Sequence, residues 1–228
     1  MFKRLIAICA FAALPVAANA TTIDFDAADS TSSQVVGFGG FYSEDGYTFA
    51  VTYTGPGEGP AIFNTLCTGY GGTDGCNGDG DLVPGVQGEN DVSGNILIIQ
   101  ENRGSAPTPN DEAGAGSITF TLVTGPAFQL LGFSAIDDGQ FSLFDNSSNL
   151  LGMIDNGNGA ANDNVTGMIS GLVSPIFNVG DSFTIGYSGS GGVDSLVLAA
   201  VPLPAGAVLL LGALGGLGAI RRRANRAA

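Results

Sequence analysis

The chain of 228 residues has no histidine and no tryptophan, and it has only seven Lys and Arg residues against 21 Asp and Glu. Six of the seven basic residues lie near the two ends, so Arg103 is alone between residues 21 and 204, where all 21 acidic residues fall. That segment therefore has a net charge of −20. Such a charge disfavours nucleic acid and anionic surfaces as partners and favours cations.

The absence of histidine from the chain, and of lysine between residues 21 and 204, also removes the bases on which many enzymes depend. No serine stands in a Gly-x-Ser-x-Gly motif. Carboxylate pairs such as Asp137 with Asp138, or Glu44 with Asp45, have the chemistry of glycoside hydrolysis. With 21 acidic residues, however, such pairs are expected by chance. The sequence therefore predicts that the protein is not an enzyme.

Cysteine is scarce, with three residues in the chain. Cys67 and Cys76 flank a glycine-rich stretch that is flexible enough to bring them together. In an oxidising compartment these two residues are expected to form a disulfide. Metal binding and thiol catalysis are weaker alternatives, because the chain has no histidine to act as a ligand or base.

No stretch between residues 21 and 200 has the pattern of a soluble helix, and alternating apolar and polar residues recur instead. In residues 47–53, for example, Tyr47, Phe49, Val51 and Tyr53 share one face, as in a half-buried strand. Glycine, asparagine, aspartate and proline separate these patterns. They predict an all-β, antiparallel β-sandwich, with a jelly roll as the most favoured topology. The expected strands are 22–26, 35–42, 47–53, 95–100, 118–122, 127–136, 140–145, 150–155, 165–172, 183–187 and 193–199, and the expected long loops are 56–60 and 103–116.

The first 20 residues have the three parts of a secretory signal peptide. Lys3 and Arg4 are basic, an apolar core follows, and Ala18 and Ala20 form an A-x-A cleavage site. This pattern predicts export by the Sec machinery and removal of residues 1–20.

The C-terminal tail has three parts as well: Val201-Pro202-Leu203-Pro204-Ala205, an uncharged run to Ile220, and a basic end with Arg221, Arg222 and Arg223. Counted from Ala205, the uncharged run reaches about 24 Å as a helix, somewhat short of a bilayer core of about 30 Å. The arginines predict a cytoplasmic end, which places the preceding domain across the membrane. Both a lasting anchor and a transient one fit this pattern.

The stretch VPLPAGAVLLLGALGGLGAIRRR closely resembles the PEP-CTERM sorting signal, in its VPLPA form, of exported proteins in Gram-negative bacteria. The resemblance implies processing by an exosortase, passage through the inner membrane, and a final place on the outer surface or in the extracellular matrix. Proteins of this kind accompany exopolysaccharide and biofilm matrix, which implies a structural or adhesive role. The expected organisation is a signal peptide (1–20), a β-sandwich domain (21–200) and a sorting signal with a transmembrane helix (201–228).

Calcium is the cofactor that the acidic residues favour, because it binds oxygen ligands. Asp24 and Asp26 are expected on the first strand and Asp194 at the start of the last. If these strands are neighbours, the carboxylates repel one another unless a cation lies between them. This pattern is similar to glycan-binding jelly-roll modules with a structural calcium, which makes a calcium-stabilised carbohydrate-binding module the alternative function. A second possible calcium site is Asn77, Asp79 and Asp81, and possible sugar-binding rings are Tyr42, Tyr70 and Tyr187.

Overall fold

The computed structural model describes residues 20–26, 40–65, 82, 94–101, 114–137, 139–157, 166–201 and 215. The predictions for Ala18, for Cys67 and Cys76, for the site at Asn77, Asp79 and Asp81, and for the tail beyond Val201 lie outside these residues, apart from the single residue 215. Among the described residues, no helix has the length and apolar character needed to cross a membrane. Residues Asn19–Val201 form one compact unit.

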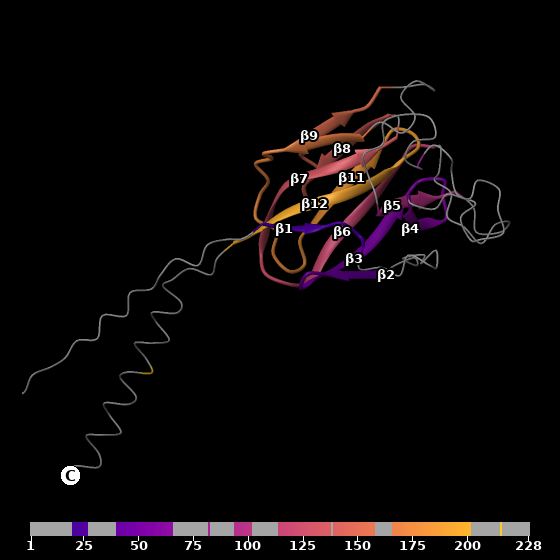
Figure 1. Cartoon of the computed structure of the whole chain (residues 1–228). Helices are drawn as coiled ribbons and strands as arrows, with labels where there is room; N and C mark the ends of the chain where they lie inside the picture. The colour runs from indigo at the N-terminus through magenta and orange to yellow at the C-terminus, as the bar shows by residue number, and fades with distance from the viewer. Residues whose placement is uncertain are drawn as a thin grey trace, which may run out of the picture. The chain divides into compact units, whose positions relative to one another are not determined.

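Within the described residues the unit contains twelve strands in two antiparallel sheets (Figure 1). The all-β, antiparallel architecture is as predicted, with one strand more than the eleven expected. We call them sheet A and sheet B. Sheet A comprises β1 (Ala20–Ile23), β4 (Gly59–Asn64), β5 (Asn95–Gln100), β7 (Phe128–Ile136), β10 (Thr166–Ser170) and β12 (Gly192–Ala200). Sheet B, in spatial order, comprises β2 (Gly40–Glu44), β3 (Tyr47–Thr54), β6 (Gly116–Thr124), β11 (Ser182–Tyr187), β8 (Gln140–Phe144) and β9 (Leu150–Asp155).

Aromatic side chains fill the space between the sheets. Phe49, Phe120 and Phe183 point inward from sheet B because they occupy alternate positions on their strands, and all are buried. The Phe120 and Phe183 rings stack with centroids 4.9 Å apart. Phe128 from sheet A meets the Phe49 ring edge-on, at 5.9 Å and 85°. Such pairs add about 0.5–1.5 kcal/mol each to the burial of apolar area.

Strand β5 is buried on both faces, which explains its uninterrupted apolar sequence. Leu97 and Ile99 lie in the core between the sheets. Ile96 and Ile98 belong to a second, smaller cluster that also contains Phe63 and Leu82. The strand predicted at 95–100 is confirmed, and all six of its residues are buried.

Strand β4 was not predicted, and Gly59 and Pro60 were wrongly placed in a loop. Proline disfavours a central strand because it has no N–H to donate. In the described order of sheet A, however, β4 is the end strand and pairs only with β5, with Pro60 opposite Ile99. An end strand tolerates proline, so the sequence that follows it, Ala-Ile-Phe, is buried in the sheet.

The first strand of the domain pairs with the last, as the calcium prediction requires. Ala20 is opposite Ala199 and Ile23 is opposite Leu196 in an antiparallel pair. Figure 1 shows β1 alongside β12. The two ends of the described domain therefore lie next to each other.

Candidate functional site

The candidate site lies where β12 changes its neighbour. Gly192 and Val193 of β12 pair with β5, whereas Leu196 and the three residues after it pair with β1. Between these two regions the register of β12 against β7 shifts, and Ser195 has a φ of 51°. The end of β1 and the start of β5 therefore meet opposite Asp194 and Ser195.

Asp24 and Asp26 lie in the turn that follows β1 and not on the strand itself, which corrects the prediction. Between them, Phe25 has a φ of 62°. Its ring is fully buried, with centroids 5.1 Å from Tyr42 and 6.5 Å from Phe120. Because the ring is anchored in the core, the turn holds both aspartates toward the surface, where Asp24 is half-buried and Asp26 is exposed. We call residues 24–26 the acidic turn.

Asp26 joins the acidic turn to the start of β5, almost 70 residues away in the sequence. Its Oδ1 accepts a hydrogen bond of 2.7 Å from the Asn95 backbone N–H. The Asn95 Nδ2 donates to the Phe25 carbonyl at 3.2 Å. Gly94 lies so close that a Cβ there would be 2.6 Å from Asp26 Oδ1, so this position has room only for glycine.

Glu44 is a fourth carboxylate at this site, and the sequence prediction missed it. It is on β2 of sheet B, and its Oε2 accepts hydrogen bonds from the Phe25 N–H at 3.1 Å and from the Tyr42 hydroxyl at 2.9 Å. Glu44 thus links sheet B to the turn that follows a strand of sheet A. The predicted strand ended at Tyr42; extending its alternation by two residues would have placed Glu44 on the same inward face.

Burial and neighbouring charges raise the pKa values of two of these carboxylates, Glu44 and Asp194. Burial raises the pKa of Glu44 to about 7, and Asp24 adds to the rise through a hydrogen bond and through its charge. Burial also raises the pKa of Asp194 to about 6, and the charges of Asp24 and Asp26 act in the same direction. The Ser195 N–H and hydroxyl donate to Asp194 at 2.6 and 3.0 Å and partly offset this rise.

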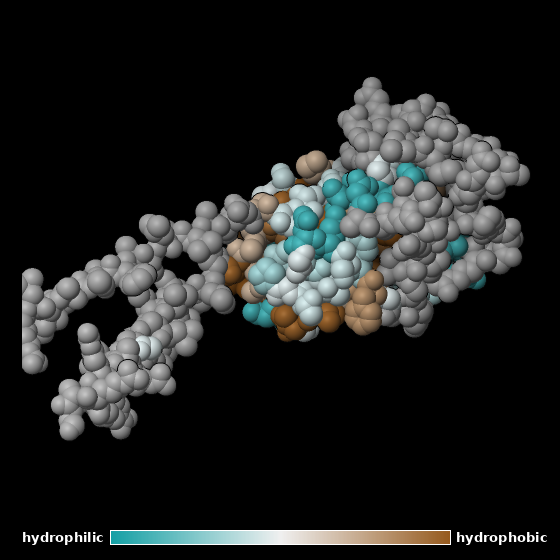
Figure 2. Space-filling model, turned by 60° about the horizontal axis from the view of Figure 1, so that its bottom comes forward, coloured by the Kyte–Doolittle hydropathy of each residue, from teal (hydrophilic) through white to brown (hydrophobic). Residues whose placement is uncertain are grey.

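No described residue is a lysine, arginine or histidine, so within the described part of the chain no basic side chain neutralises this cluster. In that same part, no three acidic, histidine or cysteine side chains converge closely enough to form a metal-binding group. In Figure 2, strongly hydrophilic residues, coloured teal, lie at several places on the described surface, with the largest group near its centre. The site thus has the oxygen ligands that calcium prefers, without a preassembled set of three.

The tyrosines considered for sugar binding do not form a surface. Tyr42 and Tyr187 are only 7% and 5% exposed and pack in the core, and Tyr70 lies outside the described residues. In one of the acidic pairs, Glu44 points inward whereas Asp45 lies exposed in the turn between β2 and β3. In the other pair, Asp137 is buried, with a φ of 80°, and Asp138 lies outside the described residues.

Comparison with known proteins adds no relative. No protein-family model, curated protein or solved structure matches this chain. The resemblance of the tail to the PEP-CTERM signal therefore stays a prediction, and the function has to be argued from the residues and the site.

Proposed function

We propose that the chain is an exported, non-catalytic β-sandwich protein of the bacterial surface or extracellular matrix, stabilised by calcium at the acidic turn. The observation that carries this proposal is the position of four carboxylates where the first and last strands of the domain meet. No basic side chain in the described part of the chain neutralises them, so a bound cation is expected to stabilise the pairing of the first and last strands. The signal peptide and tail supply the expected route, through the Sec machinery and an exosortase.

Calcium fits the chemistry of the side chains at this site. Asp24, Asp26, Glu44 and Asp194 offer only oxygen atoms, and calcium completes its coordination with carbonyl and water oxygens. Burial is the main cause of the raised pKa values of Glu44 and Asp194, and a bound cation removes the repulsion from neighbouring carboxylates that adds to it. Its role is structural, because it ties the turn after β1 to β12 and to β2.

The deciding experiment compares the thermal unfolding of the full chain in about 5 mM CaCl₂ with that in EDTA, since extracellular calcium modules bind in the ~0.1–1 mM range. We expect calcium to raise Tm by several degrees, because a ligand of the folded state stabilises it. Asp194→Asn keeps the size of the side chain and one oxygen that can accept from Ser195, but it removes the charge and should abolish the rise. Asp155→Asn, at an exposed acid of β9, is the matched control and should keep it. An unchanged Tm on chelation, or a calcium response that survives in Asp194→Asn, contradicts the proposed site.

The proposed route predicts the ends of the mature protein. Mass spectrometry of the terminal peptides should find Thr21 as the first residue and should find no peptide containing Arg221, Arg222 or Arg223. In a host strain that lacks its exosortase, the arginines should remain and the protein should stay with the inner membrane. A surface-located protein that keeps the arginines would show that the tail is a lasting anchor.

A jelly-roll topology is the finer part of the proposal. It is supported by the pairing of the first and last strands in sheet A and by the repeated passage of the chain between the two sheets. An experimental structure that traces residues 65–94 and 101–114 tests it, because those connections decide the order in which the strands cross.

A further inference from the structure

The outward face of sheet B is lined by hydroxyl groups. On β3, β6 and β11 the large apolar residues point into the core, so the alternate positions face outward. Those positions hold mainly serine and threonine. We call this surface the hydroxyl face; its central members are Thr52, Thr54, Ser117, Thr119, Thr121, Ser182 and Thr184.

The strand register arranges these hydroxyl groups in rows. Thr52 is opposite Thr119, which is opposite Thr184. In the neighbouring rows Thr54 is opposite Ser117, and Thr121 is opposite Ser182. Adjacent strands lie about 4.8 Å apart, and residues two apart on a strand are separated by about 6.8 Å. The face is therefore a regular two-dimensional array of hydroxyl groups.

Hydrogen bonds between strands hold this array in place. The hydroxyls of Thr119 and Thr184 lie 2.8 Å apart, and those of Thr54 and Ser117 lie 2.7 Å apart. A hydroxyl pair of this kind uses one of its two O–H donors, which leaves the other donor and several lone pairs for a ligand. A ligand that binds here meets groups that are already ordered, which lowers the entropic cost of binding.

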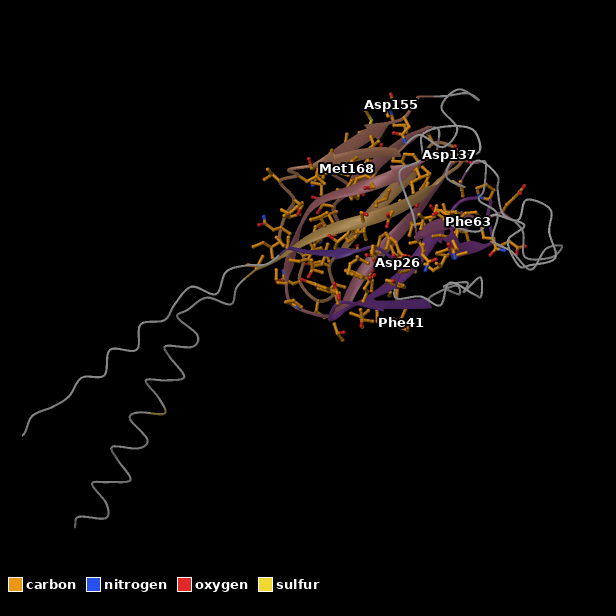
Figure 3. All side chains as sticks on the ribbon, in the orientation of Figure 1. Asp26, Phe41, Phe63, Asp137, Asp155 and Met168 are labelled. Carbon is orange, nitrogen blue, oxygen red and sulfur yellow. The ribbon has the colours of Figure 1, made fainter. Side chains whose placement is uncertain are left out.

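Apolar side chains border the hydroxyl face at both edges. Phe41 on β2 is 66% exposed and lies opposite Ala50 in the row of Thr121. At the other edge Phe144 of β8 is opposite Thr184 and pairs with the exposed Leu150 of β9. Four strand spacings, roughly 19 Å, separate β2 from β8. Figure 3 shows Phe41 at the margin formed by β2.

Charge is nearly absent from this surface. Among the described outward residues of the sheet B strands, Asp155 is the one charged side chain, and it lies at the end of β9 opposite Gln140. Figure 3 shows Asp155 and Phe41 on well-separated parts of the domain. A domain with a net charge of −20 thus keeps one broad face neutral.

We propose that the hydroxyl face binds a neutral polysaccharide chain. Its ordered hydroxyls match the donors and acceptors of sugar hydroxyls, and the aromatic faces at its borders suit the C–H groups of sugar rings, because ring faces carry negative charge. The neutral face avoids the repulsion that the rest of the domain imposes on anionic polymers. A protein partner fits less well, since protein interfaces have their apolar residues at the centre and polar residues at the rim, the reverse of this arrangement.

This inference rests on the proposed extracellular function, for which it names the ligand class and the surface. The test is native affinity electrophoresis of the full chain in mild detergent, in gels that contain dextran, hydroxyethylcellulose or galactomannan, with anionic alginate as the comparison. We expect at least one neutral polymer, and not alginate, to retard the protein. Phe41→Ala should weaken the binding about tenfold, and the double variant Thr52→Val with Thr119→Val about fivefold. Valine keeps the strand preference of threonine, so the double variant remains informative if Phe41→Ala folds poorly.

Met168→Ala and Thr22→Val are matched controls, because both residues are exposed on strands of sheet A. They should leave binding unchanged. The inference is overturned if none of the three neutral polymers retards the protein, if alginate alone does, or if the two variants of the hydroxyl face bind as well as the controls. If the protein forms a dimer and Phe41→Ala dissociates it, the hydroxyl face binds a second copy of the chain, and the inference is also overturned. The calcium response and the processed termini are measured separately, so failure of this inference is distinguishable from failure of the proposed function.

Discussion

Phe25 shows how one residue can set the geometry of a site. A positive φ costs a residue other than glycine roughly 1–2 kcal/mol. Full burial of a phenylalanine side chain contributes about 1.5–3 kcal/mol, and the ring contacts with Tyr42 and Phe120 add to this. Burial therefore offsets the strain, and the acidic turn holds its shape because the core holds the ring.

Glu44 gives the domain an unusual response to pH. Its pKa rises from the usual 4.5 to about 7, chiefly through burial and then through Asp24, so the folded chain binds this proton more tightly than the unfolded chain. The resulting stability is fully present below pH 4.5 and is lost as the pH rises through 7. In EDTA we expect the free energy of unfolding to fall by about 1 kcal/mol from pH 5 to pH 8; solvent screening of the half-exposed Glu44 limits the effect.

Urea unfolding at several pH values checks this prediction, with Glu44→Gln as the variant. Glutamine keeps an oxygen that accepts from Phe25 and Tyr42 but does not titrate, so most of the fall above pH 6 should disappear. Asp194, whose pKa is raised to about 6, adds to the fall at the lower end of this range in both proteins. Asp145 and Asp181 do not interfere, since hydrogen bonds from Asn149 and Asn178 lower their pKa values further below the range. A wild-type protein that becomes more stable from pH 5 to pH 8 would contradict the prediction.

At the level of single residues, the sequence predicted Asp24, Asp26 and Asp194 as one group. The structure places all three near the junction of β1 and β12, where the charges of Asp24 and Asp26 act on Asp194, but they do not converge into a metal-binding group. The prediction depended on one assumption, namely that the first and last strands of the domain are neighbours in the sheet. It missed Glu44, whose role depends on the contact between the edge strand β2 and the acidic turn. The close approach of Gly94 to Asp26 was also unpredictable, because it depends on where β5 begins relative to a turn almost 70 residues earlier.

Among the strands, alternation of apolar and polar residues predicted those with one buried face, such as β3, β6 and β11. The strand predicted at 95–100 is β5, which is buried on both faces. Strand β4 was missed because its first two residues, Gly59 and Pro60, are typical of a loop, although an end strand accommodates Pro60. The pairing of β12 with β5 and β1 in turn was not predicted either, since no local pattern marks a change of partner.

Gly132 of β7 fixes the distance between β7 and the end strand β10. A Cβ at this position would collide with the Ile169 carbonyl oxygen and lie 3.2 Å from Ser170 Cα, both backbone atoms of β10. We therefore expect Gly132→Ala to lower the free energy of unfolding by about 2 kcal/mol, within the range of overpacked sites. Hydrogen exchange should become faster in residues 166–170, because the collision separates β10 from β7.

Gly186→Ala is the control for this substitution. Gly186 is also in a strand, but the nearest neighbour of an added Cβ would be 3.6 Å away, an ordinary contact. Its free energy of unfolding should change by less than about 0.5 kcal/mol. Equal destabilisation by the two substitutions, measured by urea unfolding, would show that the loss of glycine itself matters and not the approach of β10.

For the whole domain, pairing β1 with β12 brings together the two positions at which the chain is expected to be cut. Ala20, at the predicted signal-peptide site, is opposite Ala199, two residues before the VPLPA motif begins at Val201. The core begins only three residues after Ala20, at the buried Ile23. The mature domain can therefore lose both flanking segments without losing a buried side chain of the described sandwich.

The net charge of −20 between residues 21 and 204 leads to the last prediction. Like charges at this density destabilise the compact state, and salt screens them, with a Debye length of about 30 Å at 0.01 M and about 8 Å at 0.15 M. We expect Tm to rise by several degrees when NaCl is raised from about 0.01 to 0.15 M. CaCl₂ at matched ionic strength should raise it further, whereas MgCl₂ should not, because magnesium demands a stricter geometry and gives up its water reluctantly. Asp194→Asn should keep the response to NaCl and lose the additional response to calcium. If NaCl alone reproduces the full effect of calcium, the four carboxylates act only through general repulsion, and the acidic turn is not a calcium site.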